Sequence, residues 1–506
     1  MTVTDVAARG TNRRTITRTI GSASLMTVVQ YAVSLVVAPV VLGQAGVSIF
    51  GVWATIASVL AVGALADAGL RLEIGRRVAD ALGEDDDDAM RRAVHHGTTL
   101  LAVVAGLVVV LGALAAPLIR AFVFPHGAPG LGAGELDLLL RLTFLLLGVS
   151  LLADGYFAVL RGIQRADVEY GARLIGLVVG TVVLVVGLFA GWSIWALFVG
   201  AAVQDVVAIG IQAVGVRRIL PGLRFRVRAV PATAVRSMVA LSGMALVSQL
   251  SDVVDSQWDK VMLSRYVGSA AVAGFQIGTT LTLQAKAVAL LPVIPLLVGV
   301  AELRKRDRVR AERLLDVLGS ATFALGAVML ATLVVFAAPF VRLWLDRPMP
   351  GAVISAQLFA VAVACNLLAA PLAYRALGES RHHLTAIASL ANIVVNALLS
   401  YALTVTIGLR GPLYGSIVGN AVGTAVFFVM MRRALGTDWR APSWRAPLIG
   451  VVAALGGLAL GLDAVSTWPT LLLGVGAFAA LVGIAAIAAE RLPWRDVLAR
   501  RIGAPA

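Results

Sequence analysis

Long apolar runs alternate with short charged segments along almost the whole chain. A helix that crosses the hydrocarbon core of a bilayer needs roughly 20 apolar residues, and most of these runs reach that length. The pattern therefore predicts fourteen membrane-spanning helices. Their approximate bounds are 20–42, 47–70, 95–118, 137–160, 171–189, 193–215, 239–262, 272–300, 316–340, 353–374, 382–405, 411–431, 446–464 and 468–489.

The composition excludes the soluble classes of protein. The 506 residues are 59% hydrophobic and 14% charged, with a mean hydropathy of +0.91. Soluble domains average ~45–50% apolar and ~25% charged residues. A single cysteine, Cys365, excludes a disulfide scaffold. We expect an all-α polytopic membrane protein in which the first apolar run is a retained helix and not a cleaved signal.

The positive charge follows the predicted topology. The formal net charge is +14, but no basic stretch with interleaved aromatic residues points to nucleic-acid binding. With the N-terminus in the cytoplasm, 34 of the 42 basic residues fall in inner segments and 5 in outer ones. Such an asymmetry is what the positive-inside rule describes. We therefore expect a multi-pass protein of the cell (plasma) membrane with both termini in the cytoplasm.

The predicted spans divide into two halves of six. Leu42–Leu60 and Tyr266–Leu283 form a weak repeat, because each places a glycine-bearing turn between the first and second helix of its half. Duplicated halves around a central site are a common transporter architecture. The predicted parts are a cytoplasmic N-terminal segment (1–19), an N-lobe (20–215), a basic cytoplasmic linker (216–238), a C-lobe (239–431), a second linker (432–445), two further spans (446–489) and a cytoplasmic tail (490–506).

The seventh predicted span carries a polar stripe. Its members recur at three- and four-residue steps and so share one helix face: Gln249, Asp252, Asp255 and Asp259. An aspartate at the bilayer centre costs ~2.5–3.5 kcal/mol on insertion scales, so the stripe must face a hydrated cavity or other helices. For Asp259 and the adjacent Lys260 a position at the outer membrane interface is the alternative.

Four further ionisable residues inside predicted spans are candidates for the site. Lys286, near the middle of the eighth span, is expected either to pair with Asp252 or Asp255 or to meet an anionic substrate. Asp205 and Asp154 are candidates for the N-lobe face of the cavity. Arg141, near the outer end of the fourth span, either joins them or extends its side chain to the membrane interface.

No arrangement of residues indicates catalysis. The acidic run at residues 84–88 lacks the glycine of a calcium loop, and the histidine pairs at 95–96 and 382–383 have no further ligands at metal-binding spacing. No nucleotide-binding motif is present. We expect no catalytic residues, no metal site and no bound cofactor, with energy coming from a gradient; Na⁺ or H⁺ is the candidate coupling ion.

Three short motifs resemble the polysaccharide-transporter branch, of the oligosaccharide or O-antigen flippase type, in the multidrug/oligosaccharidyl-lipid/polysaccharide (MOP) flippase superfamily. They are Gly51-Val-Trp53, Leu65-Ala-Asp67-Ala-Gly69-Leu70 followed by Arg76-Arg77, and Asp259-Lys-Val-Met-Leu263 followed by Gly268 and Gly274-Phe275. The resemblance covers most of residues 15–435.

That resemblance implies two six-helix lobes around a central cavity plus two extra helices. It also implies transport of a polyprenyl-linked oligosaccharide from the inner to the outer leaflet for cell-surface polysaccharide biosynthesis. The diphosphate would then meet Lys286, Lys260 and Arg141, while the acidic and polar residues would bind sugar hydroxyls or a coupling cation. Expected partners are the bilayer, a polysaccharide polymerase and glycosyltransferases, and we expect a monomer.

Two other functions remain open at this point. A cation-coupled multidrug exporter of the same superfamily would be favoured by a carboxylate in the first span. That span has no Asp or Glu, and Gln30 is the nearest equivalent that it offers. A membrane enzyme of wall-polysaccharide assembly would need an outer loop with catalytic acids, and Glu135 is the only carboxylate of the outer segment 119–136.

The charge of the predicted cavity bears on the substrate. Asp205, Asp252 and Asp255 outnumber Lys286 there, so the cavity is acidic on balance. A peptidoglycan precursor is therefore a less favoured substrate than another wall or capsular unit.

Overall fold

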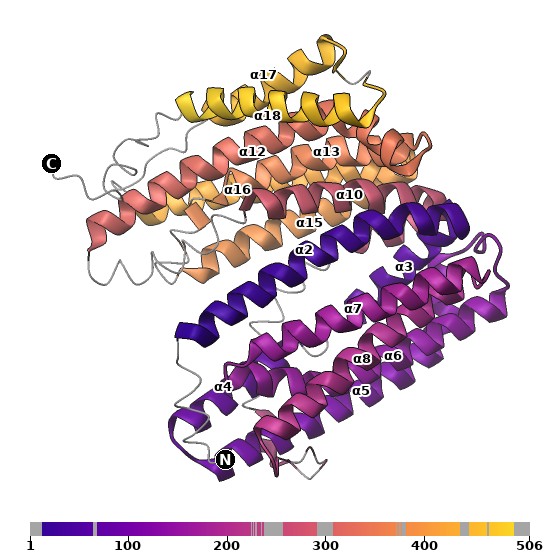
Figure 1. The fold of residues 1–506 in the computed structure, drawn as a ribbon, viewed down its shortest axis with the longest axis vertical. Helices are drawn as coiled ribbons and strands as arrows, with labels where there is room; N and C mark the ends of the chain where they lie inside the picture. The colour runs from indigo at the N-terminus through magenta and orange to yellow at the C-terminus, as the bar shows by residue number, and fades with distance from the viewer. Residues whose placement is uncertain are drawn as a thin grey trace. The chain divides into compact units, whose positions relative to one another are not determined.

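The computed structural model describes residues 13–63, 68–223, 225, 227, 230–233, 235–236, 257–290, 307–370, 372–373, 376, 381–435, 445–462 and 465–489. This part of the chain is almost entirely helical (Figure 1). Ten of its helices are long and apolar enough to cross a membrane. They are α2 (Arg13–Gln44), α5 (Asp87–Val123), α6 (Ala133–Gly162), α7 (Ala166–Phe189), α8 (Ile194–Ile219), α12 (Arg308–Leu345), α13 (Pro350–Leu367), α15 (His382–Ile407), α16 (Arg410–Leu435) and α18 (Trp468–Ala489). The prediction of an all-α polytopic membrane protein is confirmed.

The remaining predicted spans are shorter, more polar or partly outside the described residues. α3 (Val47–Gly63) and α17 (Arg445–Ala459) are short apolar helices. α10 (Ser269–Leu290) carries three threonines, two glutamines and a lysine among its apolar residues. Only residues 257–266 of the seventh span are described, and they are helical. Each of the fourteen predicted spans thus has a helical counterpart, in whole or in part.

The structure differs from the prediction after the second span. We expected one helix over 47–70 followed by an inner loop over 71–94, but α3 ends at Gly63 and a separate helix, α4 (Ala68–Gly83), follows. α4 is amphipathic because Leu70, Ile74 and Val78 recur every four residues and are buried. Five of its other residues are charged, so burial of one face, and not length in apolar residues, explains why this segment is helical.

The unit Met1–Ala273 is built from paired helices (Figure 1). α5 packs along α6, α7 packs along α8, and α2 lies against α7. One apolar core joins α4, α5 and α6 through residues such as Ile74, Leu101 and Leu160. Leu220, Leu223 and Phe225 pack onto that core, so the beginning of the predicted linker 216–238 belongs to the folded unit.

The unit Gly274–Ala506 is organised around α12. α13, α17 and α18 all contact α12, and α15 packs along α16. In Figure 1 the last two helices lie beside α12. Ala331, Ala454 and Val482 form one of the small apolar cores between these helices. The two further spans predicted at 446–489 are therefore packed onto this unit.

Two local features recur in both halves of the sequence. The turn after α2 has Gly46 at φ 90° with its N–H donating to Val41 O, and the turn before α10 has Gly268 at φ 115° with its N–H donating to Leu263 O. At both helix ends the glycine donates to the carbonyl five residues earlier and has a positive φ, a conformation that glycine adopts without strain. α5 and α12 also share the motif Ala-Pro-x-x-Arg near their C-terminal ends, at Pro117 and Pro339.

Candidate functional site

Three polar residues and one phenylalanine follow one face of α6 toward its C-terminal end. Its members recur at steps of four, three and four residues and so share one side of the helix: Ser150, Asp154, Phe157 and Arg161. Ser150 Oγ donates a hydrogen bond to Asp205 Oδ2 of α8 at 2.9 Å. Both carboxylates predicted for the N-lobe, Asp154 and Asp205, therefore lie along this face.

Asp154 is compensated by an arginine of α4. Arg71 Nη1 lies 3.3 Å from Asp154 Oδ1, and the two side chains are 26% and 17% exposed. Because both groups are largely withdrawn from water, they need each other's charge. The contact also ties α4 to α6. From the sequence, Arg71 is one of the basic residues of the predicted inner segments. The structure places it beside Asp154, a predicted site residue.

Three arginines from three helices surround the ring of Phe157. The guanidinium carbons of Arg71 (α4), Arg161 (α6) and Arg173 (α7) lie 4.7, 4.5 and 5.1 Å from the ring centroid. These distances fall within the ~6 Å range of cation–π attraction. We call these three residues the arginine cluster. Three like charges on one ring repel one another, so the arrangement requires nearby negative charge.

Glu169 supplies much of that negative charge. Its side chain is 1% exposed, its Oε2 lies 3.2 Å from Arg161 Nε, and its Oε1 lies 3.4 Å from Arg173 Nε. With Asp154 on Arg71, two carboxylates pair with the three guanidinium groups of the cluster. Arg161 and Arg173 remain 44% exposed. The cluster can therefore still be reached by an anion from solution.

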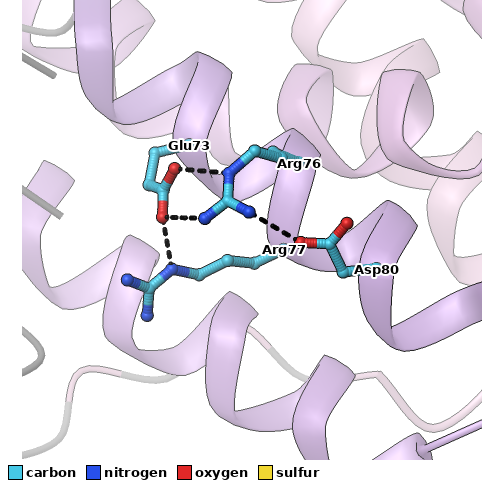
Figure 2. A network of polar contacts seen from close by, with 4 residues as sticks. All are labelled: Glu73, Arg76, Arg77 and Asp80. Carbon is cyan, nitrogen blue, oxygen red and sulfur yellow. Dashed lines mark hydrogen bonds and ion pairs between the residues drawn. The ribbon is translucent and has the colours of Figure 1, made fainter. Parts of the chain in front are cut away.

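Ion pairs stabilise α4, the helix that supplies Arg71 (Figure 2). Glu73 Oε2 accepts from Arg76 Nε at 2.9 Å, and Glu73 Oε1 accepts from Arg77 Nε at 2.7 Å. Arg76 Nη1 also donates to Asp80 Oδ2 at 2.8 Å. Burial raises the pKa of the Glu73 carboxyl, but the hydrogen bonds and charges of Arg76 and Arg77 outweigh it and hold that pKa below its ordinary value. Arg76 and Arg77 are thus part of the structure of α4.

The arginine cluster was not predicted from the sequence, although one spacing in the sequence indicates part of it. Glu169 and Arg173 stand at i and i+4 on α7, a spacing that favours an ion pair on a helix. Glu169 is also an acidic residue at the start of a predicted span. The contribution of Arg71 and Arg161 depends on how three helices pack, which no local spacing encodes.

Lys286 contacts an amide in the unit Gly274–Ala506. Its Nζ donates to Asn366 Oδ1 of α13 at 3.3 Å. A cavity of about 130 Å³ lies beside Asn366. It is lined by amides and hydroxyls, among them Asn366, Thr385, Ser389, Asn392, Asn420 and Thr424. None of the lining residues that the structure describes carries a carboxylate, so they offer neutral hydrogen-bonding groups of the kind that bind sugar hydroxyls.

Asp259 and Lys260 are buried in the helix at residues 257–266, with 1% and 9% of their surface exposed. Lys260 Nζ donates to Gln257 Oε1, one turn earlier, at 2.9 Å. Both side chains thus pack within the protein, which is compatible with the central cavity and with the outer membrane interface. Three other members of the predicted polar stripe, Gln249, Asp252 and Asp255, lie outside the described residues.

Arg141 is exposed and separate from the polar face of α6. Nine residues separate it from Ser150. At the rise and rotation of an α-helix this is roughly 14 Å along the axis and the opposite side of the helix. The structure does not bring Arg141 together with Asp154 and Asp205.

Among the described residues there is no group of three or more His, Cys, Asp or Glu side chains that could hold a metal ion.

The sequence matches one family model. The family is described as "Polysaccharide biosynthesis protein", and the match covers residues 16–297, more than half of the chain. No curated protein sequence matches the chain.

Solved structures of similar fold are membrane transporters. The lipid II flippase MurJ in an inward closed conformation is 11% identical, with a TM-score of 0.70, over 94% of this chain and 99% of the other. An inward-facing multidrug resistance MATE family transporter of the MOP superfamily is 15% identical, with a TM-score of 0.63, over 81% and 94%. A MOP superfamily transporter from Pyrococcus furiosus is 17% identical, with a TM-score of 0.54, over 84% and 96%. At these identities the likeness concerns the fold.

Proposed function

Because the chain belongs to the polysaccharide biosynthesis protein family and has the fold of the MOP superfamily, we propose that it moves a lipid-linked oligosaccharide unit from the inner to the outer leaflet by alternating access. The predicted family is confirmed. The protein is a membrane transporter of the flippase type and not an enzyme, as predicted. The substrate unit, the direction of transport and the residues involved are the content of the proposal.

The arginine cluster is the observation that supports it most. A guanidinium group offers a planar fork of N–H donors that matches phosphate oxygens. Arg161 and Arg173 are each 44% exposed, so part of each guanidinium group is open to a ligand. The helix ends around it carry the basic segments that the positive-inside rule places in the cytoplasm. We assign the cluster to the first contact with the diphosphate of the substrate on the inner side.

Polar neutral groups fit the other part of such a substrate. An oligosaccharide presents many hydroxyls and little charge, and it is bound by hydrogen bonds to amides, hydroxyls and carboxylates. The amide-lined cavity beside Asn366 and the Ser150–Asp205 pair supply such groups in the two units. Lys286 and the stripe of Gln249, Asp252, Asp255 and Asp259 remain our candidates for the central cavity.

A cation-coupled multidrug exporter is the alternative that the fold also accommodates. The arginine cluster disfavours it, because an exporter of organic cations needs exposed carboxylates, whereas Glu169 is buried beneath two arginines. Na⁺ or H⁺ stays our candidate for coupling. We also propose a plasma-membrane location, cytoplasmic termini, a monomeric state and functional partnership with a polysaccharide polymerase and glycosyltransferases.

The test is transport by purified protein in liposomes, with a fluorescent oligosaccharide on polyprenyl diphosphate in the inner or outer leaflet. We expect leaflet exchange without nucleotide, at least tenfold slower in Arg161→Gln/Arg173→Gln. Arg141→Gln, on the opposite side of α6, is the control. An absolute ATP requirement, or efflux of cationic dyes with no movement of the lipid-linked sugar, would overturn the proposal.

A further inference from the structure

A cavity of about 1000 Å³ opens at one end of the unit Gly274–Ala506. It lies between the C-terminal end of α12, the first turn of α13 and the turn that joins α15 to α16. The opposite ends of α12 and α16 carry Arg310 and Arg433 among other arginines. The positive-inside rule therefore places this cavity on the outer side of the membrane.

The lining combines an apolar wall with positive charge. Among the described lining residues the polar side chains are those of Arg342, Gln357, Arg410 and Tyr414, and none carries a carboxylate. The first residues of α13 and α16 also line it, so the positive ends of two helix dipoles add to the two arginines. The wall consists mainly of aliphatic residues, among them Ala338, Pro339, Met349, Val353, Ile354 and Leu409. This combination suits an anion that carries an apolar chain.

The repeat within the chain shows what is special about Arg342. Arg120 holds the same position in the Ala-Pro-x-x-Arg motif of α5, and its Nε pairs with Asp137 Oδ1 of α6 at 2.7 Å. Asp137 is the fifth residue of α6, and the fifth residue of α13 is Ile354. The N-lobe arginine is thus neutralised by a carboxylate, whereas Arg342 faces an aliphatic wall and donates to the backbone oxygen of Val465 at 2.6 Å.

The rim of the cavity belongs to a surface that is suited to lipid. Ile407 and Tyr414 line the cavity and are 45% and 39% exposed. Below them, α15 exposes Leu398 and Val405, as a helix does where it faces acyl chains. Lys286 and Asp259, the described residues that we assign to the central cavity, do not line this one. A molecule of the bilayer itself is therefore a better fit than the transported sugar.

We propose that this cavity binds an anionic phospholipid of the outer leaflet, with its phosphate between Arg342 and Arg410 and the upper part of its chains against the apolar wall. Two guanidinium groups neutralise and hydrogen-bond the phosphodiester. The tyrosine at the rim lies at the depth where aromatic side chains meet headgroups. The lipid contacts the ends of α12, α13 and α16 and would hold them together. Among the described lining residues no carboxylate pairs with Arg342 or Arg410 to do so.

The experiment measures lipid binding to the purified full chain by native mass spectrometry, with phosphatidylglycerol, phosphatidylcholine and polyprenyl diphosphate as separate probes. We expect phosphatidylglycerol to bind with higher affinity than phosphatidylcholine. Arg342→Gln/Arg410→Gln should weaken its binding about tenfold or more. Val353→Trp, which fills the cavity without changing charge, should cause a similar loss.

Arg347→Gln is the matched control. Arg347 lies in the segment between α12 and α13, next to the lining residue Pro348, but does not itself line the cavity. Its binding should equal that of the unmodified chain. Equal weakening in Arg347→Gln would mean nonspecific attraction and would overturn the proposal. Retention of phosphatidylglycerol in Val353→Trp would do the same. Preferential binding of polyprenyl diphosphate, lost in the same variants, would assign the cavity to the transported substrate instead.

Discussion

Glu169 accepts a hydrogen bond from Arg161 at 3.2 Å, so a carboxylate in the first turn of α7 holds an arginine in the last turn of α6. The same carboxylate pairs with Arg173. One buried acidic group therefore fixes two of the three arginines of the cluster. The positions of these arginines depend on Glu169 more than on any single contact with the ring of Phe157.

Replacing Glu169 by glutamine should destabilise the protein. The substitution removes a buried negative charge and leaves Arg161 and Arg173 facing a neutral amide, which should lower the free energy of unfolding by about 1–3 kcal/mol. Thermal unfolding in detergent measures the change. Asp167→Asn is the control, because Asp167 pairs with Arg165 in the same turn of α7 but lies outside the cluster. An equal loss in both variants would contradict the central position of Glu169.

The ring of Phe157 should contribute stability beyond its apolar volume. Phe157→Leu keeps a large aliphatic side chain but removes the π-face that three guanidinium groups share. We expect a loss of about 1–2 kcal/mol relative to the same change at Phe144. Phe144 lies on the same helix, and each of the two residues is 6% exposed. Comparable melting temperatures for the two leucine variants would show that the arginines gain nothing from the ring.

Gly51 should not tolerate any side chain. A Cβ at this position would overlap the backbone oxygen of Ser269, and backbone cannot rotate away as a side chain can. Gly51→Ala should therefore force α3 away from the start of α10 and cost about 1–3 kcal/mol. Gly43→Ala, on α2, meets no atom within 4 Å and should be neutral or slightly stabilising. Differential scanning fluorimetry of the two variants decides the point.

Stability should fall at acid pH in a way that depends on Glu73. The pKa of this carboxyl is held below its ordinary value of 4.5 in the folded protein, so its contribution is fully present above about pH 4.5 and is lost as the pH falls through the lower folded value. At pH 7, Glu73→Gln should be less stable than the unmodified chain. Between about pH 5 and about pH 3 its free energy of unfolding should fall less than that of the unmodified chain. Glu84→Gln, at an exposed site, should retain the full acid dependence.

Transport should respond to the predicted central residues and not to Arg141. Lys286→Ala removes the donor to Asn366, and Asp252→Asn removes a carboxylate from the polar stripe of the seventh span. Both should slow leaflet exchange of lipid-linked sugar by about tenfold or more, the usual cost of a lost charged contact. Arg141→Ala should leave the rate nearly unchanged. Normal rates in both of the first two variants would remove Lys286 and Asp252 from the site.

Helix positions were predictable because a membrane leaves little choice. A long apolar run must satisfy its backbone groups internally, so it becomes a helix wherever it occurs. The error after Gly63 arose because Ala68 and Leu70 continue the apolar run of α3 by composition. The four-residue spacing of Leu70, Ile74 and Val78 indicates the separate amphipathic helix α4, but apolar length alone conceals it.

The candidate site was predictable only in its acidic members. Asp154 and Asp205 stand out because a carboxylate inside a span is costly. Arg71, Arg161 and Arg173 do not stand out, because the positive-inside rule assigns the same meaning to every arginine at an inner helix end. Such an arginine forms a site only if the packing of the helices brings it to Phe157 and Glu169. Local sequence spacing does not show how the helices pack.

The glycine turns at Gly46 and Gly268, and the Ala-Pro-x-x-Arg motifs at Pro117 and Pro339, are the features that a tandem duplication of one half would leave. Six spans return a chain to the side of the membrane on which it began. A second copy joined in tandem would therefore keep the orientation of the first, and no inversion would be needed to make a full-length protein. Two such copies in one chain can also differ in chemistry, as the helices that follow the two motifs do: the fifth residue is Asp137 in α6 and Ile354 in α13.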